Sequence, residues 1–259
     1  MIRSGGCAPA LVTGAAGGIG AAVATALAAE GRPVALLDRS AAGVGELAEK
    51  LAADGHETCA LAADVTDPRA VWAAVATAEE VLGPLGVLVN GAGALVSGAL
   101  LDLDLDEWSR AFAVNTDGVF HVSRAVGRRM RERREGSIVT ITSNSAGVPR
   151  AGIGAYASAK AAATMFTRCL GLELAPAGVR CNIVCPGSTD TPMLRELLGD
   201  ADLDAVVAGD PAAFKVGIPL GRVADPADVA EAVVFLASPK ARHITMQALY
   251  VDGGATLRA

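Results

Sequence analysis

The amino-acid sequence predicts a single α/β domain in which helices cover both faces of a doubly wound parallel sheet. Short apolar runs, typical of strands buried on both faces, alternate along the chain with longer stretches of helical character. The first apolar run leads into a glycine-rich turn and then an alanine-rich stretch, an order typical of Rossmann-type dinucleotide-binding folds. The 259 residues are enough for one such domain with a large core.

The expected elements follow one another in β-α order. The expected strands are residues 10–12, 33–37, 87–89, 137–141 and 181–185, with a further strand ending before residue 64. The expected helices cover residues 21–29, 44–54, 67–82, 106–134 and 155–174. The sequence has no internal repeat and no low-complexity linker. We therefore expect one domain over residues 1–259, with a dinucleotide-binding half at about 8–135 and a catalytic and substrate-binding half at about 136–259.

The turn after the first strand contains Gly14, Gly18 and Gly20, spaced G-x-x-x-G-x-G. Glycines at such a turn let the backbone approach a pyrophosphate at the positive end of the following helix. Residues 9–29 carry no charge, so a flexible loop, a signal peptide and a membrane span are the alternatives. The glycines in the middle of this segment argue against the last two. We interpret the segment as a phosphate-binding turn.

Asp38 closes the next apolar run and lies eighteen residues after Gly20. A carboxylate at the end of the second strand accepts hydrogen bonds from an adenosine ribose and repels a 2′-phosphate. The sequence therefore predicts NAD as the cofactor in preference to NADP. Arg39 keeps the alternative open, because an arginine at this place can meet a 2′-phosphate, although the glycine turn itself contains no Lys or Arg.

Three residues indicate a proton-transfer site. Tyr156 follows Ser143 by thirteen residues and precedes Lys160 by four. If residues 155–163 are helical, the Tyr156 and Lys160 side chains share one face, and the ammonium lowers the pKa of the phenol. A Tyr-x-x-x-Lys pattern alone is common on exposed helix faces. Beside a predicted dinucleotide site, the three residues indicate a base that acts on alcohols.

In this order, the glycine turn and the Ser143, Tyr156 and Lys160 set resemble the short-chain dehydrogenase/reductase family, over nearly the whole chain. Further matching features lie at residues 64–65, 90–93, 115 and 186–191. The chain departs from the family pattern in two places. Gly91 stands where many members have Asn, and Ala-Ser-Ala separates Tyr156 from Lys160 where many members have x-Ala-Ser. Neither departure removes a catalytic group.

The resemblance implies a set of site residues and their roles. The cofactor-binding residues would be Gly14, Gly18, Ile19, Gly20, Asp38, Asp64, Val65, Asn90, Ala92, Gly93, Tyr156, Lys160, Pro186, Gly187, Thr189 and Thr191. The catalytic residues would be Asn115, Ser143, Tyr156 and Lys160, and the substrate-binding residues Ser143, Arg150, Tyr156 and Met193. In this scheme Ser143 orients the substrate oxygen, Tyr156 takes the hydroxyl proton, and Lys160 stabilises the phenolate and holds the nicotinamide ribose. Ser145 is a competing candidate for the role of the serine.

Residues 148–150, 178–191, 214–221 and 243–254 are similar to one subgroup of this family, the 2,3-dihydro-2,3-dihydroxybenzoate dehydrogenases of catechol siderophore biosynthesis. In particular, Met246 stands where most members of the wider family have glycine. The resemblance implies an NAD-dependent oxidation of a small-molecule substrate, a carboxylated cyclic diol, to a ketone that tautomerises to the aromatic catechol. Aromatisation makes this direction nearly irreversible.

The carboxylate of such a substrate needs a cation. Arg150 lies between Ser143 and Tyr156, on a loop expected to wall the site, and is the first candidate for a bidentate bond. Its placement is equally compatible with a solvent-facing loop arginine. Lys215 and Arg222 are the reserve candidates, near a segment at 188–216 that is expected to close over the substrate.

Composition argues against several classes of partner. The net charge of −6 disfavours nucleic acid, and the basic run at residues 128–134 is better interpreted as a solvated helix end. Five scattered cysteines fit reduced thiols and hence the cytoplasm, and three distant histidines predict no metal site. We expect no nucleic-acid partner and no membrane partner. The resemblance implies a homotetramer, built partly through the helix that carries Tyr156.

Three other functions stay open at this point. The first is a different NAD(P)-dependent alcohol dehydrogenase or a 3-oxoacyl reductase of the same family, against which Asp38 and the expected carboxylate-binding arginine argue. The second is a non-catalytic NAD-binding regulator, which would leave the complete catalytic set unexplained. The third is a structural protein, which would leave the glycine turn unexplained.

Overall fold

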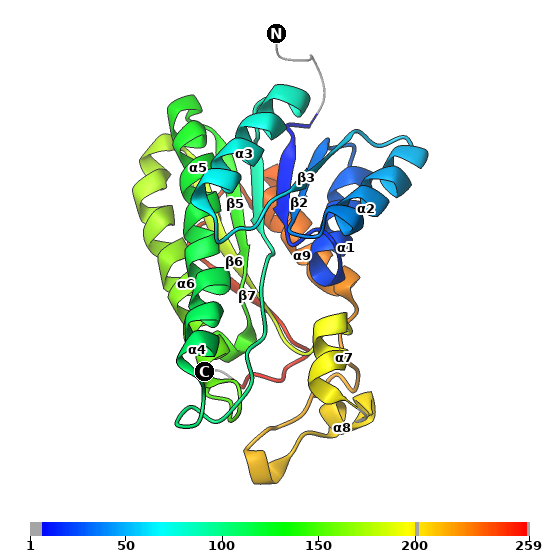
Figure 1. Cartoon of the computed structure of the whole chain (residues 1–259), viewed down its shortest axis with the longest axis vertical. Coiled ribbons are helices and arrows are strands. Elements are labelled where there is room, and N and C mark those ends of the chain that lie inside the picture. The colour runs from blue at the N-terminus through cyan, green and yellow to red at the C-terminus, as the bar shows by residue number, and fades with distance from the viewer. Residues whose placement is uncertain (1–6, 200–201, 258–259) are drawn as a thin grey trace.

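The computed structural model describes residues 7–199 and 202–257, and these residues form a three-layered α/β domain (Figure 1). Within the described chain, seven parallel strands form one sheet in the order β3-β2-β1-β4-β5-β6-β7. The strands are β1 (Ala10–Thr13), β2 (Val34–Asp38), β3 (Thr58–Ala62), β4 (Val87–Asn90), β5 (Gly136–Ile141), β6 (Val179–Pro186) and β7 (Ala248–Val251). The α-helices are α1 (Gly18–Ala29), α2 (Ala41–Ala53), α3 (Pro68–Leu82), α4 (Leu105–Phe112), α5 (Gly118–Arg133), α6 (Gly154–Leu174), α7 (Pro192–Leu198), α8 (Leu203–Ala208) and α9 (Pro226–Ala237). The predicted doubly wound parallel sheet is confirmed.

The larger helices divide between the two faces of the sheet (Figure 1). Helices α1, α2 and α9 pack on one face, and α3, α5 and α6 pack on the other. The strands supply both cores, because successive side chains point to opposite faces. Val12 of β1 lies in the first core and Leu11 in the second. Strands buried on both faces are therefore mostly apolar, which is the pattern from which they were predicted.

The helical stretch expected over residues 106–134 is confirmed to within one residue at each end, but a π-helical turn at Ala113–Asp117 separates α4 from α5 within it. Within the turn, Asn115 Nδ2 donates to the carbonyl oxygen of Ala111 at 2.9 Å. The same amide donates to the carbonyl oxygen of Ala94 at 2.8 Å, on the loop after β4. The interruption thus directs a buried amide at a neighbouring loop, as such turns often do at functional sites.

Between β6 and α9 the chain leaves the sheet and forms a lobe that carries α7 and α8 (Figure 1). The two ends of this excursion are bonded to each other. The backbone N–H of Ala224 donates to the Ser188 carbonyl oxygen at 3.1 Å, and that of Asp190 donates to the Ala224 carbonyl oxygen at 2.9 Å. The lobe lies beyond the carboxyl ends of the strands, where open α/β sheets bind their ligands.

The packing of α1 against α9 generates a stability prediction. Ala24 of α1 has no exposed surface and lies in the core that also contains Ala230 and Val233 of α9. Ala24→Leu should lower the free energy of unfolding by about 1–3 kcal/mol, because a filled core does not accept extra methylene groups without strain. The matched control is Ala29→Leu at the exposed end of the same helix, which should change it by less than about 0.5 kcal/mol. Urea unfolding measures both, and equal losses would contradict this account of the core.

Candidate active site

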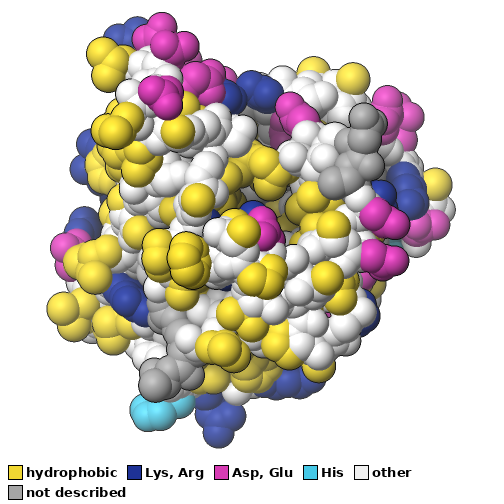
Figure 2. Space-filling model, turned by 90° about the horizontal axis from the view of Figure 1, so that it is seen from below, with side chains coloured by type: hydrophobic (Ala, Val, Ile, Leu, Met, Phe, Trp, Pro, Cys, Tyr) yellow, Lys and Arg dark blue, Asp and Glu magenta, His cyan; other side chains and the backbone are white. Residues whose placement is uncertain are grey.

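Two adjoining cavities open at the carboxyl ends of the strands, the end of the molecule that Figure 2 views. The first has a volume of about 480 Å³ and the second about 700 Å³. Hydrophobic side chains surround the hollow in this face (Figure 2). The residues that line both cavities are Ile19, Thr142, Tyr156, Thr191 and Met193. The predicted base, Tyr156, therefore stands where the two cavities meet.

The glycine turn after β1 packs directly against the turn after β4. The hydroxyl oxygen of Thr13 accepts hydrogen bonds from the backbone N–H groups of Gly91 at 3.0 Å and Ala92 at 3.1 Å. Gly14 has a φ of +72°, and a Cβ there would lie 2.8 Å from the Ala92 backbone. A Cβ at Gly20 would overlap the carbonyl oxygen of Gly14. Only glycine fits these two positions, because backbone meets backbone.

The first cavity fits a dinucleotide. Helix α1 begins at Gly18, so its unpaired N–H groups and the positive end of its dipole lie at the cavity wall. A Cβ at Gly17 would meet no described atom within 4 Å, which leaves the backbone accessible to a phosphate. Asp38 also lines this cavity, and its carboxylate accepts hydrogen bonds from the backbone N–H groups of Ala16 at 3.2 Å and Ser40 at 3.0 Å. These bonds fix the carboxylate in place, with lone pairs left for ribose hydroxyls.

Most of the predicted cofactor residues lie together. Those that line the first cavity are Gly14, Gly18, Ile19, Gly20, Asp38, Asp64, Val65, Ala92, Gly93, Tyr156, Lys160 and Thr191. Pro186, Gly187 and Thr189 line the second cavity, beside Tyr156. Arg39 lines the first cavity from an exposed position next to Asp38. The side chain of Asp64 accepts bonds from the backbone N–H and the hydroxyl of Thr66, both at 2.8 Å, which fixes the loop after β3.

Asn90 is the predicted cofactor residue that the structure places outside both cavities. Its side chain is buried, and Nδ2 donates to the hydroxyl oxygens of Ser123 at 2.9 Å and Thr140 at 3.3 Å. These bonds link β4 to α5 and β5. Asn90 therefore has a structural role: its bonds fix the end of β4, from which the turn at Gly91 and Ala92 begins. The spacing of the motif does not distinguish this position from its cavity-lining neighbours.

The structure brings Asn115 and Lys160 together around Gly93. A Cβ at Gly93 would lie 3.1 Å from Asn115 Oδ1 and 3.2 Å from Lys160 Nζ. Both side chains are buried, and Lys160 Nζ donates to the carbonyl oxygen of Ile141 at the end of β5, at 3.1 Å. Lys160 Nζ lies 5.7 Å from the centre of the Tyr156 ring, one helical turn away along α6. The predicted proton-transfer groups thus share one site.

The expected lowering of the Tyr156 pKa by Lys160 is wrong for the protein alone. Burial raises the pKa of Tyr156 to about 12, and a hydrogen bond with Ser143 opposes that rise. Burial also lowers the pKa of Lys160 to about 8, with Cys185 acting in the opposite direction. Desolvation dominates both groups, and Lys160 Nζ donates its hydrogen bond to the Ile141 carbonyl oxygen.

Ser143 follows β5 and begins a short 3₁₀ turn at Asn144–Ala146. Its hydroxyl oxygen accepts two hydrogen bonds from Ser145, one from the backbone N–H at 3.1 Å and one from the hydroxyl at 2.9 Å. Both serines line the second cavity, but Ser145 is the more deeply buried of the two. Of the two serines, Ser143 is the one whose side chain lowers the pKa of Tyr156, which favours Ser143 for the predicted role.

The second cavity has an apolar wall that sequence reasoning missed. The residues of this wall come from the loop after β4, the loop that precedes α6, and the lobe, and include Leu95, Ile153, Leu194, Leu197, Val206 and Ile218. Met193, a predicted substrate residue, lines both cavities. The run Pro192–Leu198 is the signal that could have indicated part of this wall, since three of its seven residues are leucines.

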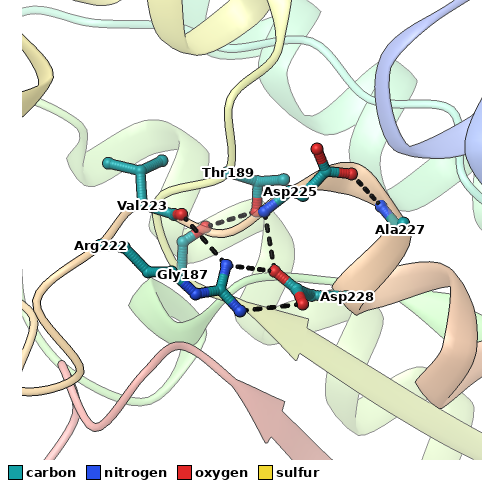
Figure 3. Close-up of polar contacts among 7 residues, drawn as sticks. All are labelled: Gly187, Thr189, Arg222, Val223, Asp225, Ala227 and Asp228. Atoms are coloured by element: carbon teal, nitrogen blue, oxygen red, sulfur yellow. Dashed lines mark hydrogen bonds and ion pairs between the residues drawn. The ribbon is translucent and has the colours of Figure 1, made fainter.

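Two of the three candidate cations reach the second cavity. Arg150 and Lys215 line it, and Arg150 Nη2 makes a long bond of 3.4 Å to the Ala255 carbonyl oxygen. Arg222 does not line it. Figure 3 shows the reason. Arg222 lies on the loop that leads into α9, and its guanidinium donates to both carboxylate oxygens of Asp228 in the first turn of that helix, at 2.7 Å and 3.0 Å. Arg222 is therefore paired with Asp228 outside the second cavity.

The sequence has curated relatives over almost its whole length. Residues 14–256 match the family model described as enoyl-(acyl carrier protein) reductase. The chain is 50% identical over 249 residues to the 2,3-dihydro-2,3-dihydroxybenzoate dehydrogenase of Bacillus subtilis (strain 168), covering 96% of this chain and 95% of the relative. It is 40% identical over 252 residues to the enzyme of the same name from Escherichia coli (strain K12), covering 96% of each chain.

Solved structures share the fold. A variant of actinorhodin polyketide ketoreductase, in a crystal structure with NADPH, is 36% identical with a TM-score of 0.89, covering 96% of this chain and 97% of that one. A 7α-hydroxysteroid dehydrogenase complexed with NADH and 7-oxo glycochenodeoxycholic acid is 29% identical with a TM-score of 0.90, covering 98% and 96%.

Proposed function

The chain belongs to the short-chain dehydrogenase/reductase family, and we propose that it oxidises 2,3-dihydro-2,3-dihydroxybenzoate to 2,3-dihydroxybenzoate with NAD, in catechol siderophore biosynthesis. The observation that carries the proposal is the position of Tyr156. It stands between a cavity that fits a dinucleotide and a second cavity of about 700 Å³ that two cations line. The sequence relatives supply the identity of the substrate, because three of them, at 40–50% identity, carry this name.

The residues of the site have the following roles in this reaction. Ser143 donates its hydroxyl proton to the substrate oxygen, and Tyr156 removes the proton from the hydroxyl that is oxidised. Lys160, next to the first cavity, binds the ribose on the nicotinamide side and holds positive charge near the phenolate. Asn115, buried in the π-helical turn, fixes the loop after β4 through its bonds to Ala94. One hydride and one proton leave the ring, which becomes aromatic after tautomerisation.

A nicotinamide cofactor held in the first cavity would supply the hydride acceptor. Tyr156 lines this cavity, and its pKa, raised to about 12 by burial, would fall if a positive charge entered the cavity, because such a charge favours the phenolate. The residues assigned to the cofactor are those that line the first cavity, together with Pro186, Gly187 and Thr189.

Arg150 and Lys215 are the candidates for the substrate carboxylate. Both line the second cavity, and Arg150 follows the turn that carries Ser143. A planar guanidinium can bind a carboxylate through two parallel hydrogen bonds, which an ammonium cannot do. We therefore propose that Arg150 binds the substrate carboxylate. Met193, which lines both cavities, would contact the substrate where it meets the cofactor.

Turnover of the purified protein tests the proposed function. Incubation with NAD and the trans-dihydrodiol acid should yield NADH and 2,3-dihydroxybenzoate in equal amounts. The runner-up function is a reductase of 3-oxoacyl thioesters or another alcohol dehydrogenase, which the size and apolar wall of the second cavity would also accept. Faster turnover of a 3-oxoacyl thioester with NADPH than of the dihydrodiol with NAD would establish the runner-up.

We also propose a homotetramer in the cytoplasm. Phe120 of α5 and Met165 and Leu172 of α6 are exposed, and the rings of Phe120 and Phe166 lie 5.8 Å apart. Large apolar side chains on two adjacent helices are typical of a surface covered by a second subunit. In the described part of the chain, no helix combines the length and the apolar character needed to cross a bilayer.

Tyr156→Phe should lower kcat by at least about a hundredfold and leave the Kd for NAD nearly unchanged, because it removes a general base and no cofactor contact of comparable strength. Steady-state kinetics and fluorescence titration with NAD measure the two effects. The matched control is Tyr250→Phe, the other tyrosine of the chain, which lines neither cavity and should keep its turnover. Retained turnover in Tyr156→Phe would rule out this mechanism.

Asp38→Ala should narrow or reverse the preference for NAD over NADP, because the charge that repels a 2′-phosphate is removed. Asp38 also holds the N–H groups of Ala16 and Ser40, so Asp38→Asn serves as the matched variant that keeps the shape and loses the charge. In Asp38→Asn, too, the preference for NAD over NADP should narrow or reverse. The ratio of kcat/KM for the two cofactors is the measurement, and an unchanged ratio in both variants would mean that another residue selects the cofactor.

Arg150→Ala should lower kcat/KM for the dihydrodiol acid by tens to thousands of fold, because truncation of one partner of a partly buried charge pair costs about 2–5 kcal/mol. An analogue without the carboxylate should be used equally poorly by the wild type and the variant. Arg150→Lys should restore part of the loss. Arg222→Ala, whose guanidinium binds Asp228, is the control and should leave KM unchanged. Additive losses from the enzyme and substrate changes would transfer the role to Lys215.

A further inference from the structure

Ser145 occupies both lone pairs of the Ser143 hydroxyl oxygen. A serine hydroxyl has one proton to donate and two lone pairs to accept with. Ser145 uses both lone pairs of Ser143 Oγ, through its backbone N–H at 3.1 Å and its own hydroxyl at 2.9 Å. The Ser143 hydroxyl is left with its proton alone, which it can only donate: to Tyr156 in the free protein, where that bond lowers the Tyr156 pKa, and to the substrate oxygen once a substrate is bound.

This restriction matters for an alcohol oxidation. The substrate hydroxyl carries a proton that has to reach Tyr156, and its oxygen needs a hydrogen-bond donor as it becomes a carbonyl. A serine with a free lone pair could accept the substrate proton and draw it away from Tyr156. A serine that only donates cannot do this, and it supports the oxygen on which charge develops.

We infer that Ser145 is a positioning residue, whose two bonds to Ser143 Oγ commit the Ser143 proton to the substrate oxygen and leave the substrate proton to Tyr156. The inference deepens the proposed oxidation and rests on it for the direction of proton transfer. Ser145 is only 6% exposed, and the 3₁₀ turn at Asn144–Ala146 brings its two donors onto Ser143. Ser145 thus acts through Ser143, although the sequence presents the two serines as rivals.

A double-mutant cycle on kcat tests this inference. Ser145→Ala frees one lone pair of Ser143 and should lower kcat about three- to tenfold, the scale of one lost hydrogen bond, with little change in KM. In the Ser143→Ala background, Ser145→Ala should change kcat by less than about twofold, because the hydroxyl that it positions is absent. Should Ser145→Ala not fold, Ser145→Cys, which keeps the size but donates weakly, replaces it in the cycle.

Ser158→Ala is the matched control, because Ser158 is an exposed serine on α6 between Tyr156 and Lys160, and its kcat should equal that of the wild type. A pH series gives a second readout. Because the bond from Ser143 lowers the Tyr156 pKa, the acid limb of kcat/KM should move to higher pH in Ser145→Ala and in Ser143→Ala, and not in Ser158→Ala. Equal losses from Ser145→Ala in both backgrounds, a change in KM alone, or an unmoved acid limb would overturn the inference.

The outcome for Ser145 can be separated from the outcome for the proposed substrate. If the wild type oxidises another secondary alcohol in place of the dihydrodiol acid, the proposed function fails, and the same cycle on that alcohol still decides the role of Ser145. A third measurement needs no turnover at all. With tyrosine labelled at Cζ in the Tyr250→Phe protein, the carbon resonance of Tyr156 should shift in the same direction in Ser145→Ala and Ser143→Ala, and no shift in Ser145→Ala would overturn the inference.

Discussion

The contact between the turns after β1 and β4 is the constraint on which the site depends. Thr13 ends β1, and its hydroxyl holds the backbone N–H groups of Gly91 and Ala92 at the end of β4. A Cβ at Gly91 would lie 2.6 Å from the Thr13 carbonyl oxygen, so the departure from the family's usual Asn at this position fits the space available. Two residues further along the same turn, Gly93 lies between the side chains of Asn115 and Lys160, so the turn also borders the proton-transfer groups.

Those parts of the molecule that depend on local pattern could be predicted from the sequence. The apolar runs give β1, β2, β4, β5 and β6 to within one or two residues, because strands buried on both faces are mostly apolar. The bounds of β3 and the existence of β7 were not predicted, and these two strands at the edges of the sheet are only partly buried. The glycine turn, Asp38 and the Tyr156–Lys160 spacing place a dinucleotide and a base at the same edge of the sheet. The π-helical turn at Ala113–Asp117 could not be predicted, since it depends on a bond from Asn115 to a loop some twenty residues earlier.

The pKa shifts and the ion pairs at the site also could not be predicted from sequence patterns. The i, i+4 spacing correctly places Lys160 one turn from Tyr156, but it does not show that the ammonium bonds Ile141 or that burial dominates both groups. Charge alone likewise does not separate Arg150 from Arg222. A carboxylate six residues further along the chain neutralises Arg222, whereas Arg150 faces the second cavity. Tertiary partners decide which cations are available to a ligand.

The bonds that tie Ser188 and Asp190 to Ala224 have an evolutionary consequence. They make residues 190–224 a closed excursion, whose ends stay together whatever happens within it. The entropy cost of closing such a loop grows only slowly with length, by about 0.6 kcal/mol for each doubling. Insertions, deletions and new side chains beyond Thr191, Pro192 and Met193, which themselves line the first cavity, therefore leave the strands and the dinucleotide cavity undisturbed. A lineage with this architecture can exchange one substrate for another while it inherits its redox chemistry unchanged.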